Sequence, residues 1–174
     1  IKLNYLKKEY TDEASKLFKN DKKYIGFSIT GGHPTRKKEM SMKAIIEVAN
    51  YYSEKNYVPT FLIEEKYKEK INMIKKLVKN PFFPEHLVHS SFKNPFLVIA
   101  IAQKLNSAIS IDNGIMHMLT LAGTKTAIFF NKSSDKFKPL NENKSRIYCS
   151  EKNKTKRIED LTSEEIIEFV KDFI

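Results

Sequence analysis

The sequence predicts an α/β protein, a Rossmann-like parallel sheet with helices on both faces. Short apolar runs rich in β-branched and aromatic residues alternate with segments whose apolar residues recur at helical spacing. Such alternation implies right-handed βαβ units, which build a parallel sheet covered on both sides. The 174 residues suffice for one domain with a real core. We expect residues 1–22 to form a linker or an interdomain helix and residues 23–174 to form the domain.

The strands and helices are expected in a regular order along the chain. Strands are predicted at 24–30, 57–63, 87–89, 108–111, 125–130 and 146–150. Helices are predicted around 42–49, 71–78, 95–105, 114–121 and from 163 onward. Pro81 and Pro84 mark a break before the strand at 87–89. Gly123 is placed to cap the helix at 114–121, and the acidic residues after Ser163 are typical of a helix start.

The composition argues against several classes of protein. The net charge of +10 comes mainly from scattered lysines, and no arginine cluster, aromatic-basic pattern or zinc-finger spacing accompanies it. We therefore expect no specific nucleic-acid binding, whereas attraction to anionic lipids or phosphorylated substrates fits the charge at least as well. The single cysteine, Cys149, excludes an internal disulfide and is expected to pack in the core. No apolar run approaches the roughly 18 residues that a membrane-spanning helix needs.

The stretch from Ile109 to His117 is the strongest candidate site. An apolar strand stops at Asp112 and Asn113, and a helix begins at Gly114 with His117 in its first turn. Ligands of parallel sheets bind at the carboxyl ends of strands, and the free N–H groups of a helix start suit a phosphate. Asp, Asn and Gly are also common at helix starts that bind no ligand. Helix capping alone therefore explains these three residues, but it does not explain His117. The pattern predicts a site for an anionic ligand.

A second candidate lies at the end of the first predicted strand. Thr30 ends that strand, and a loop at 31–38 follows with glycines, hydroxyls and cations, the last of which is Lys38. The loop fits neither the Walker nor the G-x-G-x-x-G pattern, which argues against P-loop and dinucleotide-binding functions. Each charge-assisted contact to a phosphate would contribute on the order of 1.5–3 kcal/mol. A solvated turn explains the loop equally well.

Acidic side chains follow the second predicted strand. Glu64 and Glu65 end it, and Glu69 lies one turn later. An acid at this place in a nucleotide-binding fold can accept hydrogen bonds from ribose hydroxyls. An acidic first turn of a helix is the simpler explanation. The remaining histidines have no metal-ligand spacing with any acid, so no metal site is expected.

Together these motifs resemble the C-terminal domain of bacterial heptosyltransferases, the family-9 glycosyltransferases that build the lipopolysaccharide inner core. The family carries Asp-Thr-Gly-Pro-Met-His at the strand-to-helix junction, and this chain has Asp112-Asn113-Gly114-Ile115-Met116-His117. Three later residues also agree with the family: Leu119, Ala122 and Gly123. The similarity runs from Tyr24 to Phe173 and rests mainly on the distinctive spacing of Asp, Gly, Met and His.

The chain also departs from the family pattern. Asn113 replaces Thr, Ile115 replaces Pro, and Met40 replaces Trp where the family has Lys-x-Trp-Pro after its glycine loop. The family's Phe-Gly-Pro-Thr corresponds to the stretch from Phe130 to Ser133, which has no glycine after the phenylalanine. These departures put the donor preference, and the activity itself, in question.

The resemblance implies the donor-binding half of a two-domain GT-B glycosyltransferase, with residues 23–174 as the nucleotide-sugar-binding domain. Because the chain begins with Ile1, we expect it to be part of a longer protein whose N-terminal acceptor domain is absent here. Such an enzyme transfers heptose or a similar sugar from a nucleotide-diphosphate sugar, ADP-heptose above all, to a lipopolysaccharide core acceptor. It needs no metal or other cofactor. It is expected in the cytoplasm, with peripheral contact to the inner membrane.

The resemblance also implies roles for particular residues. Lys38 would hold the diphosphate, Glu65 or Glu69 the ribose, and the motif at 112–117 would surround the diphosphate and the sugar. The full set of expected substrate-binding residues is Thr30, Lys38, Glu65, Glu69, Asp112, Asn113, Gly114 and His117. No catalytic residue is expected in this chain, because the family's general base is an Asp of the N-terminal domain.

Two other functions stay open. A non-catalytic binding module that keeps the fold but has lost the site would also explain the departures from the family. A basic nucleic-acid-binding protein would explain the charge and would show a steep salt dependence of affinity, but the chain lacks arginine clusters.

Overall fold

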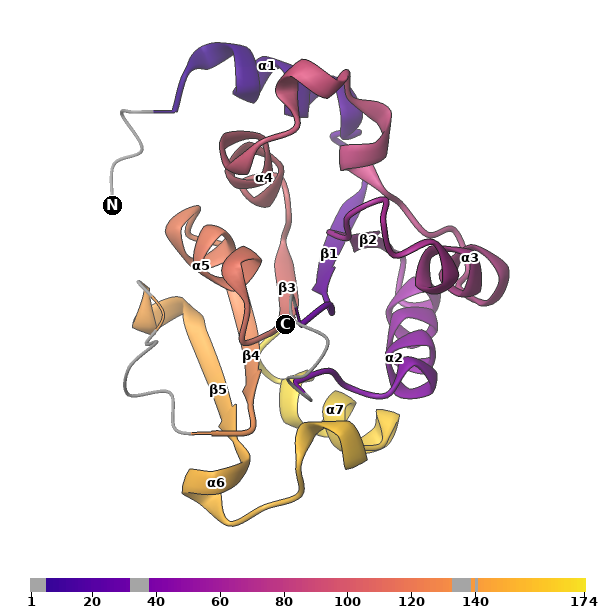
Figure 1. Ribbon diagram of the computed structural model, residues 1–174, viewed down its shortest axis with the longest axis vertical. Helices are drawn as coiled ribbons and strands as arrows, with labels where there is room; N and C mark the ends of the chain where they lie inside the picture. Colours follow the sequence, from indigo (N-terminus) through magenta and orange to yellow (C-terminus); the bar gives the residue numbers. More distant parts are fainter. Residues whose placement is uncertain (1–5, 32–37, 133–138, 140) are drawn as a thin grey trace.

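A computed structural model describes residues 6–31, 38–132, 139 and 141–174 of the chain (Figure 1). Its described residues contain a five-stranded sheet with the order β2-β1-β3-β4-β5, in which all pairings are parallel. The strands are β1 (Lys23–Ser28), β2 (Tyr57–Phe61), β3 (Ser107–Ile111), β4 (Lys125–Phe130) and β5 (Ser145–Cys149). The predicted Rossmann-like architecture is confirmed.

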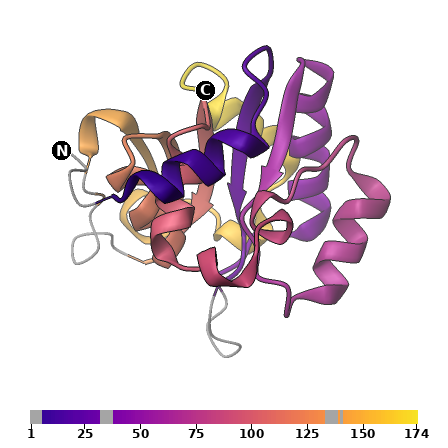
Figure 2. The ribbon, with the colours of Figure 1, turned by 90° about the horizontal axis from the view of Figure 1, so that it is seen from above.

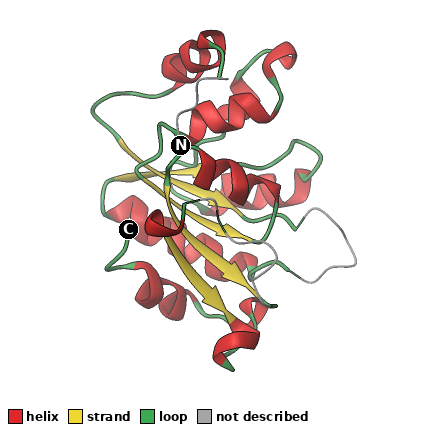
Figure 3. Ribbon diagram, turned by 90° about the vertical axis from the view of Figure 1, so that its left-hand side faces the viewer, coloured by secondary structure: helices red, strands yellow, loops and turns green. Residues whose placement is uncertain are grey.

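Helices cover both faces of this sheet (Figure 2). The first face carries α2 (Met42–Glu54), α3 (Lys68–Leu77) and α7 (Ser163–Val170). The second face carries α4 (Pro95–Ala102) and α5 (Gly114–Leu121), with α1 (Lys8–Leu17) packed on α4. A short helix, α6 (Ser150–Asn153), follows β5 at the rim. Figure 3 shows the strands running side by side between these two layers.

The core follows from the alternation of side chains along the central strands. On β1, Ile25 and Phe27 point to the layer of α2 and α7, whereas Tyr24 points to the layer of α4. On β3, Ile109 faces the first layer and Ala108 the second. Because helices cover both faces of these strands, β3 is buried at every position and β1 at every position after Lys23.

The strand predicted at 87–89 is wrong. Pro84 instead opens a 3-10 helix, Pro84–Leu87, because its fixed backbone angle suits the first position of a helix and its nitrogen cannot donate to a sheet. The edge of β2 is covered by Phe82, whose N–H donates to the Pro59 oxygen at 2.8 Å and whose oxygen accepts from Phe61 N at 2.8 Å. Of the apolar residues after Pro84, Val88 is buried against the domain without joining the sheet, whereas Leu87 is 66% exposed.

The N-terminal helix α1 packs against the rest of the chain. Tyr10 lies with its ring centroid 5.8 Å from that of Phe92 and 5.8 Å from that of Phe96. Its hydroxyl accepts a hydrogen bond from Asn94 Nδ2 at 2.9 Å. These contacts attach α1 to the start of α4. The role of residues 1–22 as an interdomain connection stays a prediction.

Two smaller sequence predictions are confirmed. Gly123 follows α5 with φ +78°, a left-handed conformation that favours glycine at a helix end. Cys149 is buried among Met116, Ile128 and Phe130, so it acts as a core residue. Among the helices that the structure describes, none is long and apolar enough to cross a membrane.

The helix α7 begins at Ser163, as predicted, and the structure adds a reciprocal pair of hydrogen bonds at its start. Thr162 Oγ1 accepts from Glu165 N at 3.3 Å, and Glu165 Oε2 accepts from Thr162 N at 2.9 Å. We expect Thr162→Ala to lower the free energy of unfolding by about 1 kcal/mol, because an N–H of the first turn loses its acceptor. Urea denaturation measures this. Thr155→Ala, at an exposed threonine, is the matched control and should change stability little.

Candidate functional site

The candidate site lies where the strand order reverses. From β1 the chain adds β2 on one side and then β3 on the other, with Ser28 in register with Ser110. The carboxyl ends of β1 and β3 are therefore neighbours at the topological switch point of the sheet. In open α/β sheets, this crevice is the general place for a ligand.

Asn113 joins the two strand ends. Its Oδ1 accepts from Met116 N at 2.9 Å and so caps α5. Its Nδ2 donates to Ser28 Oγ at 2.8 Å and to the backbone oxygen of Thr30 at 3.1 Å. One side chain thus fixes the start of α5 against the end of β1. The Thr of the family pattern could not both cap α5 and reach the two acceptors at the end of β1, because its side chain is shorter and carries one hydroxyl in place of a carboxamide.

Lys38 and Asp112 form an ion pair at this junction. The two residues come from the segment before α2 and from the end of β3, so the contact brings the two candidate motifs together. Their side chains are 29% and 19% exposed, respectively. Partial burial lowers solvent screening, so each charge is felt more strongly here than on an open surface. The ion pair places a cation and a carboxylate at the switch point.

The start of α5 is uncovered. A Cβ added at Gly114 would have no heavy atom within 4 Å outside its chain neighbours and own helix. Of the first three N–H groups of α5, only that of Met116 has an acceptor among the described residues. His117, one turn in, is half-buried. Free donors and the positive end of the helix dipole therefore face open space beside Asp112.

The two acids expected at the ribose make their described contacts outside this junction. Glu65 is bound to Lys93 by an ion pair of 2.8 Å, and its side chain is 61% exposed. The hydrogen bond from Lys93 lowers the pKa of Glu65, and the positive charge adds to the effect. Glu69 lies exposed in the first turn of α3. No described contact joins either acid to Lys38 or Asp112.

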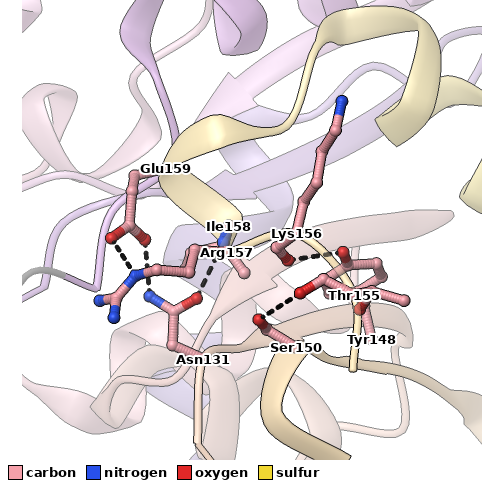
Figure 4. Close-up of polar contacts among 8 residues, drawn as sticks. All are labelled: Asn131, Tyr148, Ser150, Thr155, Lys156, Arg157, Ile158 and Glu159. Atoms are coloured by element: carbon pink, nitrogen blue, oxygen red, sulfur yellow. Dashed lines mark hydrogen bonds and ion pairs between the residues drawn. The ribbon is translucent and has the colours of Figure 1, made fainter. Parts of the chain in front are cut away.

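Sequence reasoning missed a polar cluster at the carboxyl end of β4 (Figure 4). Asn131 Nδ2 donates to Glu159 Oε2 at 2.7 Å, and its Oδ1 accepts from Ile158 N at 2.8 Å. Arg157 Nε donates to Glu159 Oε1 at 2.6 Å. Burial alone would raise the pKa of Glu159, but hydrogen bonds from Asn131, its own backbone and Arg157 outweigh it and lower the pKa.

This cluster includes one of the departures from the family pattern. Asn131 stands where the family has glycine, and its carboxamide ties the segment before α7 to the end of β4. The segments 32–37 and 133–138, which include most of the predicted loop at 31–38 and Ser133, lie outside the described residues. Within the described residues, no group of three or more His, Cys, Asp or Glu side chains could hold a metal ion.

Comparison with known proteins finds likeness in structure alone. No family model and no curated sequence matches the chain. A family-9 glycosyl transferase from Veillonella parvula superimposes with a TM-score of 0.78 at 15% identity, over 97% of this chain and 52% of that one. E. coli ADP-heptose lipopolysaccharide heptosyltransferase II gives a TM-score of 0.70 at 13% identity, over 96% and 51%.

A third solved structure, E. coli heptosyltransferase WaaC with ADP, gives a TM-score of 0.72 at 10% identity, over 95% of this chain and 48% of that one. The chain therefore spans about half the length of these glycosyltransferases. The resemblance drawn from the sequence is confirmed at the level of the fold: the chain has the Rossmann-like fold of one half of a family-9 glycosyltransferase.

Proposed function

We propose that the chain is the donor-binding half of a glycosyltransferase and binds a nucleotide-diphosphate sugar between the ends of β1 and β3. The observation that supports this most is the meeting of Lys38 with the uncovered start of α5 beside Asp112. An ammonium group and free helix N–H groups together stabilise a diphosphate. In a transfer reaction they also stabilise the charge that develops on the leaving nucleotide.

ADP-heptose is the first candidate for the donor. Two of the similar solved structures are of E. coli heptosyltransferase WaaC, one with ADP and one with ADP-2-deoxy-2-fluoro heptose. Under this proposal, the expected residues keep their roles: Lys38 at the diphosphate, Asp112 and His117 around diphosphate and sugar, and Glu65 or Glu69 at the ribose. The proposed acceptor is the lipopolysaccharide core, reached in the cytoplasm at the surface of the inner membrane.

The proposal divides the reaction between two halves. An inverting transfer needs a base that deprotonates the acceptor hydroxyl. The proposed base belongs to the acceptor half, as the family resemblance implies. We therefore expect this chain alone to bind the nucleotide and to transfer nothing, and turnover of ADP-heptose by residues 1–174 would contradict this division.

Calorimetric titration with ADP, UDP and GDP tests the proposal. Selective, saturable binding of ADP with a free energy of about −4 to −6 kcal/mol supports the heptosyltransferase-like function. Preference for UDP keeps the glycosyltransferase and changes the donor. Single-stranded DNA is the control for charge, because binding that depends on the +10 net charge alone would include DNA and fall steeply with salt.

A second candidate is a binding module whose donor site has degenerated. The observation in its favour is that three polar side chains of the junction already have partners within the chain: Lys38 pairs with Asp112, and both ends of the Asn113 carboxamide are hydrogen-bonded. Substituting Asp112 or His117 separates the two functions. Loss of nucleotide binding supports a donor site, whereas a module without a site is indifferent to either change.

Lys38→Met is expected to weaken ADP binding roughly tenfold, because a charge-assisted contact to phosphate is lost while the Asp112 carboxylate stays near the ligand. The control is Lys104→Met. It removes the same charge just before the amino end of β3, at the opposite end of the strand from Asp112. Titration of both variants with ADP measures the difference. Equal affinities for the two variants would contradict a phosphate contact by Lys38.

A further inference from the structure

Glu39 ties together three parts of the chain next to the candidate site. Its Oε1 accepts a hydrogen bond from Gly31 N at 2.8 Å, just beyond the end of β1. Its other oxygen forms an ion pair with Lys70 of α3. We call these two contacts of Glu39, with Gly31 and with Lys70, the tie. Glu39 directly follows Lys38 in the sequence, so the tie holds the backbone next to the cation of the site.

The surroundings of the tie restrict its movement. The side chains of Lys70 and Glu39 are 25% and 34% exposed, so the ion pair is partly shielded from water. The Lys70 ammonium also lies 5.6 Å from the ring centroid of Tyr67, in cation–π range. Gly31 and Lys38 bound the segment 32–37, and Glu39 therefore joins the two described ends of that segment to each other and to α3.

We propose that Glu39 and Lys70 are positioning residues for Lys38: they hold the backbone at 31 and 38–39 so that the Lys38 ammonium stays beside Asp112, facing a bound diphosphate. This rests on the proposed function. Neither residue touches the ligand. Their effect is preorganisation, since a cation already held in place loses less conformational freedom when the anion binds.

The charges of the pair provide a sharp test. If Glu39 and Lys70 acted only through their electric fields, removing the anion would tighten the binding of a diphosphate and removing the cation would weaken it. If they act as a tie, either removal breaks the same contact, and both weaken binding. The two explanations therefore predict opposite signs for Glu39→Gln and the same sign for Lys70→Met.

The experiment is calorimetric titration of the chain with ADP and with inorganic pyrophosphate. We expect Glu39→Gln and Lys70→Met each to weaken the affinity for both probes roughly three- to tenfold, which lies in the lower part of the range of coupling between residues in contact. Lys70→Arg keeps the ion pair and should retain the affinity. Matched controls are Lys43→Met and Glu168→Gln, which remove equal charges from exposed pairs on α2 and α7 and should change the affinity little.

A double-mutant cycle separates positioning from general destabilisation. Once Lys38→Met has removed the cation, adding Glu39→Gln should cost less than about twofold in affinity. The proposal is overturned if Glu39→Gln tightens binding, or if its effect persists unchanged in the Lys38→Met background. Absence of ADP and pyrophosphate binding by the unmutated chain overturns the proposed function together with this inference. Binding that is unaffected by both variants overturns the inference alone.

Discussion

Replacing Asn113 with alanine is expected to lower the free energy of unfolding by about 2–4 kcal/mol, the sum of a lost helix cap and two lost hydrogen bonds. The cap is the bond from Met116 N, and the other two run to Ser28 Oγ and to the oxygen of Thr30. Ser28 is fully buried, so its hydroxyl has little access to water as a replacement partner. Urea denaturation followed by circular dichroism measures the loss.

Asn113→Thr is the informative control, because it installs the residue of the family pattern. Its hydroxyl can still accept from Met116 N but cannot also reach both partners on the β1 side. We expect it to cost about half as much as Asn113→Ala, since capping survives and the bridge does not. If both variants were equally destabilising, the cap would contribute nothing. If Asn113→Thr were neutral, the bridge between β1 and α5 would be without energetic consequence.

The order of strands and helices could be predicted because local patterns and tertiary burial agree. The strand at 125–130 and the helix at 114–121 have the bounds of β4 and α5. β4 is apolar from Ala127 to Phe130, where it is buried on both faces. α5 has an Asn cap before it and Gly123 after it, so both of its ends carry local signals. Where the local pattern, the end signals and the burial all favour the same element, the sequence alone predicts that element and its bounds.

The predicted strand at 87–89 shows where sequence does not suffice. A short apolar run after a proline is compatible with a strand or with packing of an irregular segment, and periodicity cannot separate the two. The edge of β2 was already taken by Phe82, through hydrogen bonds to Pro59 and from Phe61. Which segment pairs with the edge of a sheet depends on contacts between residues far apart in the sequence, and a local pattern contains no information about these contacts.

The candidate site was predicted in part for the same reason. The carboxyl ends of neighbouring parallel strands meet, so Thr30, Lys38 and the residues of the 112–117 motif could be placed together from the order of elements. That these residues bind a ligand stays a prediction. The Glu39–Lys70 and Asn131–Glu159 contacts were missed, because their partners are separated by about thirty residues and ordinary charged or amide side chains carry no pairing signal.

Glu85 occupies an unusual environment near the carboxyl end of β2. Burial raises the pKa of Glu85 to about 7, with a contribution from the Glu64 carboxylate that exceeds the opposing effect of Lys93. Its carboxyl group has no hydrogen-bond partner among the described residues. Below about pH 7, Glu85 therefore stays mostly protonated in the folded chain. In the unfolded chain it ionises near the ordinary pKa of 4.5.

The direction of the resulting pH dependence follows from linkage. The stability that protonated Glu85 provides is fully present below the unfolded pKa and is lost as the pH rises through the folded pKa of about 7. Glutamine resembles the protonated acid at every pH. Glu85→Gln is therefore expected to leave stability unchanged near pH 4 and to raise it at pH 8 by about 3 kcal/mol, at about 1.4 kcal/mol per pKa unit.

Urea denaturation of the chain and of Glu85→Gln at pH 4, 6 and 8 measures this difference. Glu54→Gln, at an exposed acid ending α2, is the control that changes the same charge at a carboxylate in contact with water. The gap between Glu85→Gln and the unmutated chain should widen as the pH rises, whereas the gap for Glu54→Gln should stay small throughout. A constant gap for Glu85→Gln would mean that packing, not ionisation, accounts for its effect, because a purely steric change does not titrate.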